Sequence, residues 1–317
     1  MRKVLLFSPA FYQYGALIEK TMKNEGIYVR SFYYCTNWLY KIGVLFGATH
    51  MTNYLKGIFF NKTAKQLFGI EDSFDEVVVI RGSEIPDAFY RLLKDKYSKA
   101  RFILYLWDEI LLDPDEMKIL HYFDKVMSFS NRDCAQYGFD FRPMFIDNSV
   151  NIEDEQRIYD ILMIASYKPS RFEFLKRLLI ENRNNNYRIK VILRCSLFTF
   201  LRNPEHFKYY RYFRLFSVKY SEMISLLRRS KACIELPNPG QNAITTRPVE
   251  AMYTKTKLIT SSSSINTYDF YKSENILIID ENNPKISRSW LDSDFVSIPD
   301  TIMRNYYLTS FIKDIIS

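Results

Sequence analysis

A polar loop between an apolar run and an amphipathic segment has the clearest potential for chemistry. The run Lys231–Leu236 predicts a buried strand, and Arg247–Tyr253 predicts a helix. Backbone N–H groups at a helix start attract phosphate, and Arg247 adds a permanently charged fork. Glu250 lies three residues further, about one helical turn, so its carboxylate can face the same ligand. The spacing predicts a site for a phosphate-bearing ligand that also carries ribose or sugar hydroxyls.

Several neighbouring polar residues are candidates for the same site. Thr246 is the expected N-cap of the helix. The remaining candidates are Glu235, Gln241, Asn242 and Thr245. The alternative reading is a capped helix with a surface Arg–Glu pair. If the site binds phosphate, Arg247→Ala should abolish turnover and leave the fold intact.

A second candidate phosphate loop follows the apolar run Ile161–Ala165. Ser166, Lys168 and Arg171 lie between this expected strand and the next expected helix. Nucleotides bind at such strand–loop–helix junctions in open α/β sheets. Lys168, Ser170 and Arg171 could reach a diphosphate and neutralise the negative charge that develops on it as a leaving group, as a metal ion would. A solvated basic helix cap is the alternative.

Asp108 is the candidate proton acceptor. It follows the expected strand Phe102–Leu106, so its carboxylate should lie at a strand end, where it could accept a proton from a hydroxyl group. It could equally cap the next segment or orient a loop. No Ser or Cys motif typical of a catalytic triad accompanies the three histidines, His50, His121 and His206. The sequence therefore does not indicate a hydrolase triad. The acidic cluster Asp113, Asp115 and Glu116 favours a helix cap over a metal site.

Short apolar runs alternate with amphipathic segments along all 317 residues, which is typical of a parallel α/β protein. The expected strands are Val4–Phe7, Tyr28–Phe32, Val77–Ile80, Phe102–Leu106, Val126–Phe129, Asp160–Ala165, Ile189–Leu193, Lys231–Leu236, Lys257–Thr260 and Ile276–Ile279. The expected helices are Tyr14–Asn24, Asp87–Lys96, Pro114–His121, Asn131–Tyr137, Arg171–Asn182, Tyr220–Arg229, Arg247–Tyr253 and Ile302–Ile316. The length favours two domains, and the polar segment Asp147–Arg157 is the expected linker.

Composition excludes a disordered or low-complexity chain, because 47% of the residues are hydrophobic and 16% are aromatic. The four cysteines are far apart, which favours a reducing compartment over a disulfide framework or zinc site. The N-terminal apolar run is too short for a signal peptide, so we expect a cytoplasmic protein.

The net charge of +8 is concentrated in one stretch. Residues 168–230 contain 15 basic and 4 acidic residues, a net +11, whereas residues 1–150 contain 19 and 18, a net +1. Such a field concentrates anionic ligands. No nucleic-acid module accompanies the basic stretch, so nucleic acid is not an expected partner.

Two aromatic stretches could contact a membrane or a lipid acceptor. Ser31–Phe60 contains only Lys41 and Lys56 as charged residues, and could lie in a membrane interface or line a lipid groove. The alternative is a strand, core helices and an ordered loop. Phe198–Tyr220 interleaves five basic residues with nine Phe and Tyr residues, which suits anionic headgroups, bases or sugars.

The residues that follow the first candidate loop also resemble a known family. Arg247-Pro-Val-Glu-Ala-Met252 with Lys257-Leu-Ile-Thr260 resembles the donor-binding segment of GT-B glycosyltransferases, particularly those of bacterial capsule, exopolysaccharide and lipopolysaccharide biosynthesis. Further stretches follow in the order that this family shows: Ile103–Asp108, Asp124–Phe129 with Tyr137–Pro143, and Tyr268–Tyr271 with Asn275–Asp280. The sequence departs from the family at Asn242, where many members carry a second acid, and around Tyr253–Lys255, where a glycine is usual.

The resemblance implies two Rossmann-like domains with parallel sheets that face each other across a cleft. Residues 1–150 would form the acceptor side and residues 151–317 the donor-binding domain, with the helix near 300–317 packing back on the first domain. It also implies a nucleotide-sugar donor, no cofactor and no catalytic metal.

We therefore expect transfer of a sugar to a growing surface glycan, with a lipid-linked acceptor at the inner face of the cytoplasmic membrane. A nucleotide-sugar epimerase of the same fold and a non-catalytic binding subunit of a polysaccharide assembly complex are the alternatives.

Overall fold

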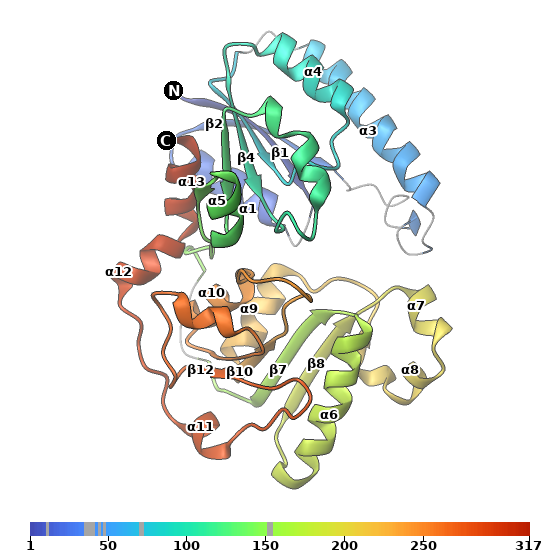
Figure 1. Ribbon diagram of the computed structural model, residues 1–317, viewed down its shortest axis with the longest axis vertical. Coiled ribbons are helices and arrows are strands. Elements are labelled where there is room, and N and C mark those ends of the chain that lie inside the picture. Colours follow the sequence, from blue (N-terminus) through green and yellow to red (C-terminus); the bar gives the residue numbers. More distant parts are fainter. Residues whose placement is uncertain (11–12, 35–41, 44–45, 47–48, 70–72, 151–154) are drawn as a thin grey trace. The chain divides into compact units, whose positions relative to one another are not determined.

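The computed structural model describes residues 1–10, 13–34, 42–43, 46, 49–69, 73–150 and 155–317. The chain forms two compact units: unit 1 consists of Met1–Pro143 and Leu308–Ser317, and unit 2 consists of Met144–Tyr307. Each unit is built on a six-stranded sheet in which neighbouring strands are parallel, with helices on both faces (Figure 1). The predicted α/β class with two parallel sheets is confirmed.

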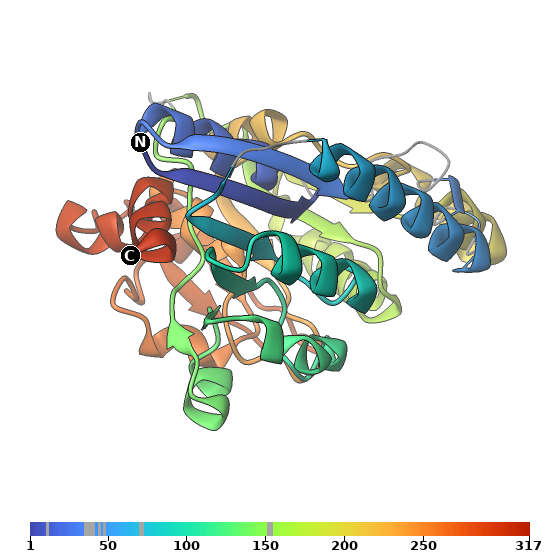
Figure 2. The same cartoon turned by 90° about the horizontal axis from the view of Figure 1, so that it is seen from above.

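The sheet of unit 1 has the order β2-β1-β3-β4-β5-β6. Its strands are β1 Lys3–Pro9, β2 Tyr28–Tyr34, β3 Glu76–Ile80, β4 Arg101–Leu106, β5 Lys125–Ser128 and β6 Asp140–Phe141. Its helices are α1 Tyr14–Asn24, α3 Thr49–Phe68, α4 Asp87–Lys96, α5 Asn131–Tyr137 and α13 Leu308–Ile316. Side chains alternate between the faces of the sheet. Phe7 therefore packs with Phe89 of α4, which in turn packs with Phe60 of α3, whereas Tyr105 of β4 meets Phe311 of α13. Figure 2 shows the unit-1 ribbon from above, with α3 in blue and α13 in red.

The sheet of unit 2 has the order β12-β11-β10-β7-β8-β9. Its strands are β7 Tyr159–Ser166, β8 Ile189–Arg194, β9 Phe213–Arg214, β10 Ser230–Glu235, β11 Lys257–Thr260 and β12 Ile276–Ile278. Its helices are α6 Pro169–Asn185, α7 Leu197–Arg202, α8 Glu205–Lys208, α9 Tyr220–Arg228, α10 Thr246–Tyr253, α11 Arg288–Asp292 and α12 Asp300–Met303. Helices α6 and α11 pack on one face of the sheet, and α9 and α10 lie on the other (Figure 1).

Two predicted helices differ from the structure. Residues 114–122 form two short 3₁₀ helices, Pro114–Lys118 and Leu120–Tyr122, in place of one α-helix. The predicted helix Ile302–Ile316 is broken into α12, a 3₁₀ turn and α13. The break has a backbone cause, since Tyr307 forms a bridge with Ile146, whose N–H donates to the carbonyl of Tyr306.

Two other sequence predictions fall partly outside the described residues. Within the aromatic stretch Ser31–Phe60, residues 35–41, 44–45 and 47–48 lie outside them, while Thr49–Phe60 belongs to α3. Within the expected linker, residues 151–154 lie outside them. In the part of the chain that the structure describes, no helix is long and apolar enough to cross a membrane.

The start of β7 is held by a charge network around Asp160. This carboxylate is 3% exposed and accepts hydrogen bonds from the backbone and guanidinium of Arg188. Lys231 lies 3.1 Å and Arg288 3.5 Å from the same carboxylate. Burial by itself would raise the pKa of Asp160, but the hydrogen bonds from Arg188 and Lys231 hold it well below its usual range. The network therefore joins the starts of β7, β8 and β10 to α11.

We predict that Asp160→Asn lowers the free energy of unfolding of unit 2 at neutral pH by about 2 kcal/mol, because charge-assisted hydrogen bonds are lost. A depressed pKa stabilises the folded state fully above the unfolded pKa of about 4 and loses this effect as the pH falls further. The difference in the free energy of unfolding between wild type and variant should therefore become smaller below about pH 4. Urea unfolding at several pH values measures this difference.

Asp294→Asn, at an exposed position, is the matched control and should change the unfolding free energy little. An equal loss in both variants, or a gap that does not depend on pH, would contradict a stabilising role for the Asp160 network.

Candidate active site

The sheet of unit 2 has a topological switch point between β7 and β10. From β7 the chain moves outward to β8 on one side, and then returns to β10 on the other side. The strands are parallel and in register, with Ile161 beside Ala232 and Met163 beside Ile234. Their carboxyl ends therefore diverge into two different loops at one edge of the sheet, which is where ligands bind in open α/β sheets.

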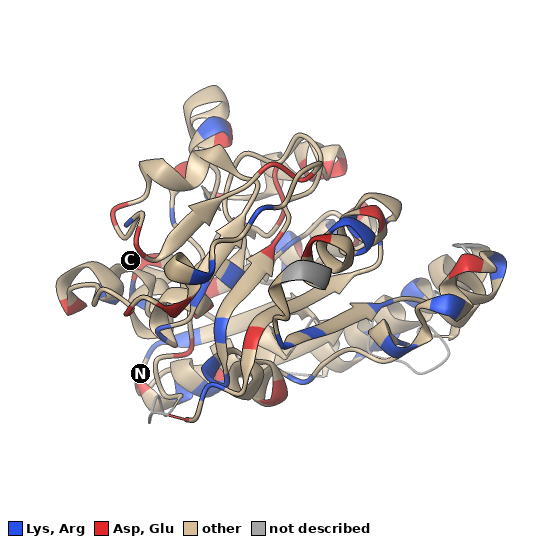
Figure 3. Ribbon diagram, turned by 90° about the horizontal axis from the view of Figure 1, so that it is seen from below, with Lys and Arg blue, Asp and Glu red and all other residues tan. Residues whose placement is uncertain are grey.

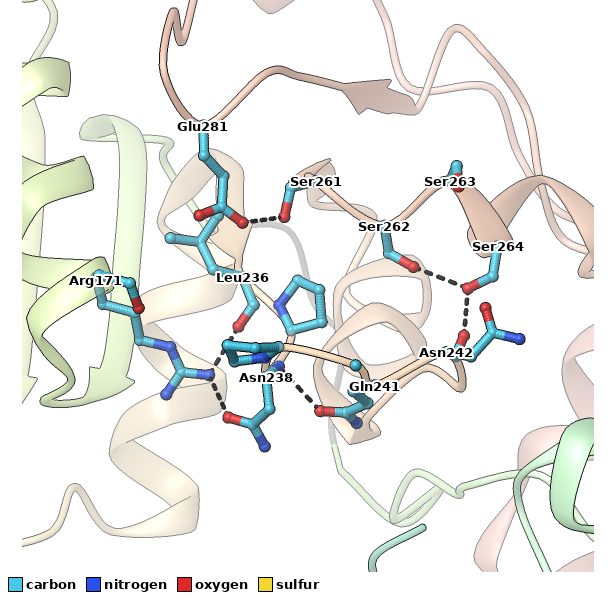
Figure 4. A pocket seen from close by; sticks show the side chains of 14 residues that line it. Arg171, Leu236, Asn238, Gln241, Asn242, Ser261, Ser262, Ser263, Ser264 and Glu281 are labelled. Carbon is cyan, nitrogen blue, oxygen red and sulfur yellow. Dashed lines mark hydrogen bonds between the residues drawn. The ribbon is translucent and has the colours of Figure 1, made fainter. Parts of the chain in front are cut away.

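A pocket of about 420 Å³ lies at this edge. It is lined by Ser170, Arg171, the loop Leu236–Asn242, the serines Ser261–Ser264 and Glu281 (Figure 4). These residues follow β7, β10, β11 and β12, so four strand ends supply the lining. A second hollow of about 500 Å³ shares Ser170, Ser261 and Glu281 with it. The lining is mostly polar, which suits a ligand rich in hydroxyl and phosphate groups.

Arg171 joins the two loops of the switch point. Its guanidinium donates to the carbonyl of Ser166 at 3.2 Å and to the carbonyl of Leu236 at 2.7 Å. It also lies 3.4 Å from the side-chain oxygen of Asn238, and Figure 4 shows the group at the wall of the pocket. Arg171 thus places a permanent positive charge in the first turn of α6.

Lys168 adds a second cation beside Arg171. It is the N-cap residue of α6, and Pro169 occupies the first helical turn. The ammonium of Lys168 donates to the side-chain oxygen of Asn238. Asn238 therefore receives donors from both cations, and its own N–H donates to the side chain of Gln241 at 3.1 Å. The loop after β10 is held close to the start of α6 by these contacts.

Glu235 is the last residue of β10 and directly precedes the pocket loop. Its two carboxylate oxygens accept hydrogen bonds from Thr260 at 3.1 Å and Thr245 at 3.3 Å. Burial raises the pKa of Glu235, although the two threonines and the nearby Arg171 and Arg247 act in the opposite direction. Glu235 thus connects the ends of β10 and β11 to the start of α10, and it is not among the pocket-lining residues.

Arg247 and Glu250 form a pair inside unit 2. A guanidinium nitrogen lies 2.8 Å from a carboxylate oxygen, and the side chains are 16% and 0% exposed. The N-cap of α10 is Thr245, whose hydroxyl accepts from the backbone N–H of Arg247, one residue earlier than the predicted N-cap Thr246. Glu250 is therefore buried and Arg247 partly buried, so the two residues do not form the surface pair of the alternative reading.

The predicted donor residues fall into two groups. Arg171, Gln241 and Asn242 line the pocket, and Lys168 contacts its loop. The others, which lie outside its lining, are Ser166, Glu235, Thr245, Thr246, Arg247 and Glu250.

Three contributions to the pocket were absent from the sequence-based candidates: Asn238, the serines Ser261–Ser264, and Glu281, which accepts a hydrogen bond from Ser261. Four consecutive serines directly after the expected strand Lys257–Thr260 were the available signal.

Asp108 lies in unit 1, in the segment that follows β4. Its carboxylate is 3.5 Å from Arg81, and its side chain is 35% exposed. Arg81 also lies 3.3 Å from Asp113 and 3.9 Å from Glu84. Asp108 is thus one of three carboxylates that share a single guanidinium, and it is the most exposed of them.

Glu116 lies close to this group. It is 1% exposed and accepts from the backbone N–H of Gly82 at 3.2 Å. Burial raises its pKa to about 7. No group of three or more His, Cys, Asp or Glu side chains in the described parts of the chain is arranged to hold a metal ion. Of the acidic cluster, Asp113 pairs with Arg81, whereas Asp115 pairs with Lys118 at 2.7 Å. Asp113 is the N-cap residue of the first 3₁₀ helix, but its side chain makes no capping hydrogen bond.

Neither a family model nor a curated protein matches the sequence. Solved structures do match. The chain is similar to Alr3699/HepE from Anabaena, solved in complex with UDP and glucose, with a TM-score of 0.57 and 10% identity over 100% of this chain and 98% of that chain. It is also similar to AviGT4, a glycosyltransferase involved in avilamycin A biosynthesis, with a TM-score of 0.55 and 10% identity over 100% and 96% of the two chains.

A UDP-N-acetylglucosamine 2-epimerase is similar as well, with a TM-score of 0.53 and 10% identity over 100% of this chain and 94% of that chain. Identities of this size bear on the fold alone. Together with the two six-stranded parallel sheets, they establish that this chain has a GT-B-like fold.

Proposed function

We propose that this protein is a glycosyltransferase that moves a sugar from a nucleotide-sugar donor to a glycan acceptor. The observation that carries the proposal is the pocket at the switch point of unit 2, where Arg171 and Lys168 stand at the start of α6 among polar loops. A diphosphate suits two cations and a helix start, and hydroxyl groups suit serine, asparagine and glutamate side chains. HepE, which shares the fold, was solved with UDP and glucose.

In this proposal the cations of unit 2 replace a catalytic metal. Negative charge develops on the leaving diphosphate as the glycosidic bond breaks, and Arg171 and Lys168 would stabilise it electrostatically. Asp108 would accept the proton of the attacking hydroxyl. The acceptor would be a lipid-linked glycan of bacterial surface polysaccharide synthesis, used at the inner face of the cytoplasmic membrane.

The epimerase is the second candidate, because a UDP-N-acetylglucosamine 2-epimerase shares the fold. The two reactions differ in their need for an acceptor. A thermal-shift panel of UDP-, GDP-, CMP- and TDP-sugars first identifies the donor, and the donor is then incubated without any glycan. Conversion to an epimer without acceptor would favour the epimerase, whereas no shift across the panel would favour a binding subunit that does not turn over nucleotide sugars.

We predict that Arg171→Ala weakens binding of the donor's nucleoside diphosphate by about 10- to 100-fold, since a charged hydrogen bond contributes about 1.5–3 kcal/mol. Arg171→Lys should recover only part of the affinity, because it keeps the charge and loses the fork. Isothermal titration calorimetry with the diphosphate measures both effects.

Lys176→Ala is the matched control on the same helix. Lys176 pairs with Glu173 and Glu205 and does not line the pocket, so its removal should leave the affinity unchanged. If Arg171→Ala binds the diphosphate as tightly as this control, the donor site is not at the switch point.

Arg247 requires a different experiment, because Glu250 is buried. We predict that Arg247→Ala lowers the free energy of unfolding by about 3 kcal/mol, since it removes the guanidinium that pairs with a buried carboxylate. The double variant Arg247→Met/Glu250→Gln should regain much of this loss, because neither charge remains. Urea unfolding of the single and double variants gives the interaction energy.

The double variant also separates stability from donor binding. If Arg247 binds phosphate, the double variant is stable but binds the nucleoside diphosphate weakly. Normal donor affinity in a stable double variant would assign the pair a purely structural role. This test replaces the simpler expectation that Arg247→Ala leaves the fold intact.

We predict that Asp108→Asn lowers kcat by about 100-fold or more and leaves donor affinity unchanged, as expected for loss of a general base. Asp113→Asn is the control, because Asp113 pairs with the same Arg81 but is only 14% exposed. Equal losses in both variants would show that the effect passes through Arg81 and not through proton transfer from the acceptor.

A further inference from the structure

The segment between β8 and α9 forms a small helical projection at one edge of the unit-2 sheet. It contains α7, α8, a 3₁₀ turn at Tyr210–Tyr212 and β9, the edge strand of the sheet. Figure 1 shows α7 and α8 beside each other, beyond β8. None of its residues lines the candidate donor pocket. The projection therefore has no role in the proposed chemistry described so far.

The inner side of the projection is a packed aromatic cluster around His206. This histidine is fully buried, with one ring nitrogen 3.0 Å from the hydroxyl of Tyr167 and the other 3.1 Å from the carbonyl of Phe200. Its ring also lies against Phe172 of α6 and Phe213 of β9. Because Tyr167 directly precedes Lys168, the cluster attaches the projection to the loop that bears the donor-site lysine.

The projection also exposes apolar side chains that do not take part in the cluster. Phe216 is 78% exposed, Tyr210 66% and Leu201 55%. The full set, which we name the α7–α8 surface, is Leu197, Phe198, Leu201, Phe207, Tyr210, Leu215 and Phe216. Seven large apolar side chains exposed within 20 residues exceed the scattered exposure that is normal for a soluble surface.

The charges around the α7–α8 surface are almost all positive. Residues 194–219 contain six basic residues and one acidic residue, Glu205. Glu205 is neutralised by Lys176, whose ammonium lies 2.9 Å away. Arg202 lies over the ring of Phe198 at 5.8 Å, and Lys208 and Arg211 are exposed beside the aromatic residues. Figure 3 shows basic and acidic residues on all parts of the ribbon. The excess of basic residues belongs to the whole stretch 168–230, of which this segment is a part.

We propose that the α7–α8 surface docks unit 2 onto an anionic lipid bilayer. Exposed Phe, Tyr and Leu side chains enter the interfacial region of a bilayer, and Lys and Arg beside them bind the headgroups. The complementarity of charge selects this occupant, because each basic residue near an anionic surface contributes about 1 kcal/mol. The proposal names a docking surface for the membrane attachment in the proposed function, and it does not depend on the donor site.

Vesicle co-sedimentation of the full chain tests the proposal. The probes are vesicles of equimolar phosphatidylcholine and phosphatidylglycerol, and vesicles of phosphatidylcholine alone. The wild type should bind the anionic vesicles at low salt, bind the neutral ones much more weakly, and dissociate at high salt. Failure to bind the anionic vesicles at low salt overturns the proposal.

Substitutions locate the surface. Arg202→Glu/Lys208→Glu/Arg211→Glu should weaken vesicle binding by about 100-fold or more, from about 1 kcal/mol for each charge. Phe198→Ser/Phe207→Ser/Phe216→Ser should also weaken it, and the loss should persist at low salt because it is apolar. The matched control Lys20→Glu/Lys62→Glu/Lys65→Glu changes the net charge equally on exposed positions of α1 and α3. Equal weakening in this control would show that net charge alone directs binding, and would overturn the assignment.

Two further measurements keep the result interpretable. Each variant should retain the wild-type circular dichroism and the wild-type affinity for the nucleoside diphosphate, because every substituted side chain is exposed and outside the pocket.

A single-stranded oligonucleotide that competes fully with anionic vesicles at equal charge concentration would identify the surface as a nucleic-acid site, and so overturn the lipid assignment. Loss of donor binding in the wild type, with vesicle binding intact, would contradict the proposed function alone.

Discussion

The bonds of Arg171 to two strand-end loops are the constraint on which the candidate site depends. In a parallel sheet the chain leaves each strand at the same edge, and at the switch point between β7 and β10 it leaves in opposite directions. Arg171 spans this divergence, since it donates to the carbonyls of Ser166 and Leu236. The positive charge is thus held by backbone groups on both sides. A side chain fixed in this way needs little reorganisation to meet an anion, which is the condition for electrostatic stabilisation of a leaving group.

Two glutamates support the loop that lines the site. Glu250 is buried and pairs with Arg247, and Glu235 is partly buried and accepts hydrogen bonds from Thr245 and Thr260. These bonds hold the end of β10 and the start of α10 together, and they determine where the pocket loop between them begins and ends. The sequence resemblance emphasised Arg247 and Glu250 as ligand contacts, whereas the pocket itself is lined by residues that these pairs position.

Most of the longer strands could be predicted from local patterns, because the strands at the centre of each sheet, such as β1, β3 and β4, are largely apolar runs. Helices such as α4 and α10 could be predicted because they are amphipathic. The exceptions depend on distant partners. Nothing near Tyr307 marks the end of a helix, and the break results from a bridge to Ile146, 161 residues earlier. Likewise Glu281 and Ser261 meet only because β11 and β12 are neighbours. Arg171, Gln241 and Asn242 could be identified because their loops follow recognisable strands.

The aromatic excess of the sequence has two physical explanations in unit 2. The rings of Phe172, Phe200 and Phe213 pack against the buried His206, with Phe172 buried and the other two partly buried, so contacts within unit 2 explain them. The rings of Phe198, Phe207 and Phe216 share the segment but not the core, and remain more than half exposed. The sequence alone cannot separate these two groups of aromatic residues, since Lys and Arg residues lie near both of them in the chain. Burial separates them, and it leaves the outer group as the part of the composition that folding of unit 2 does not explain.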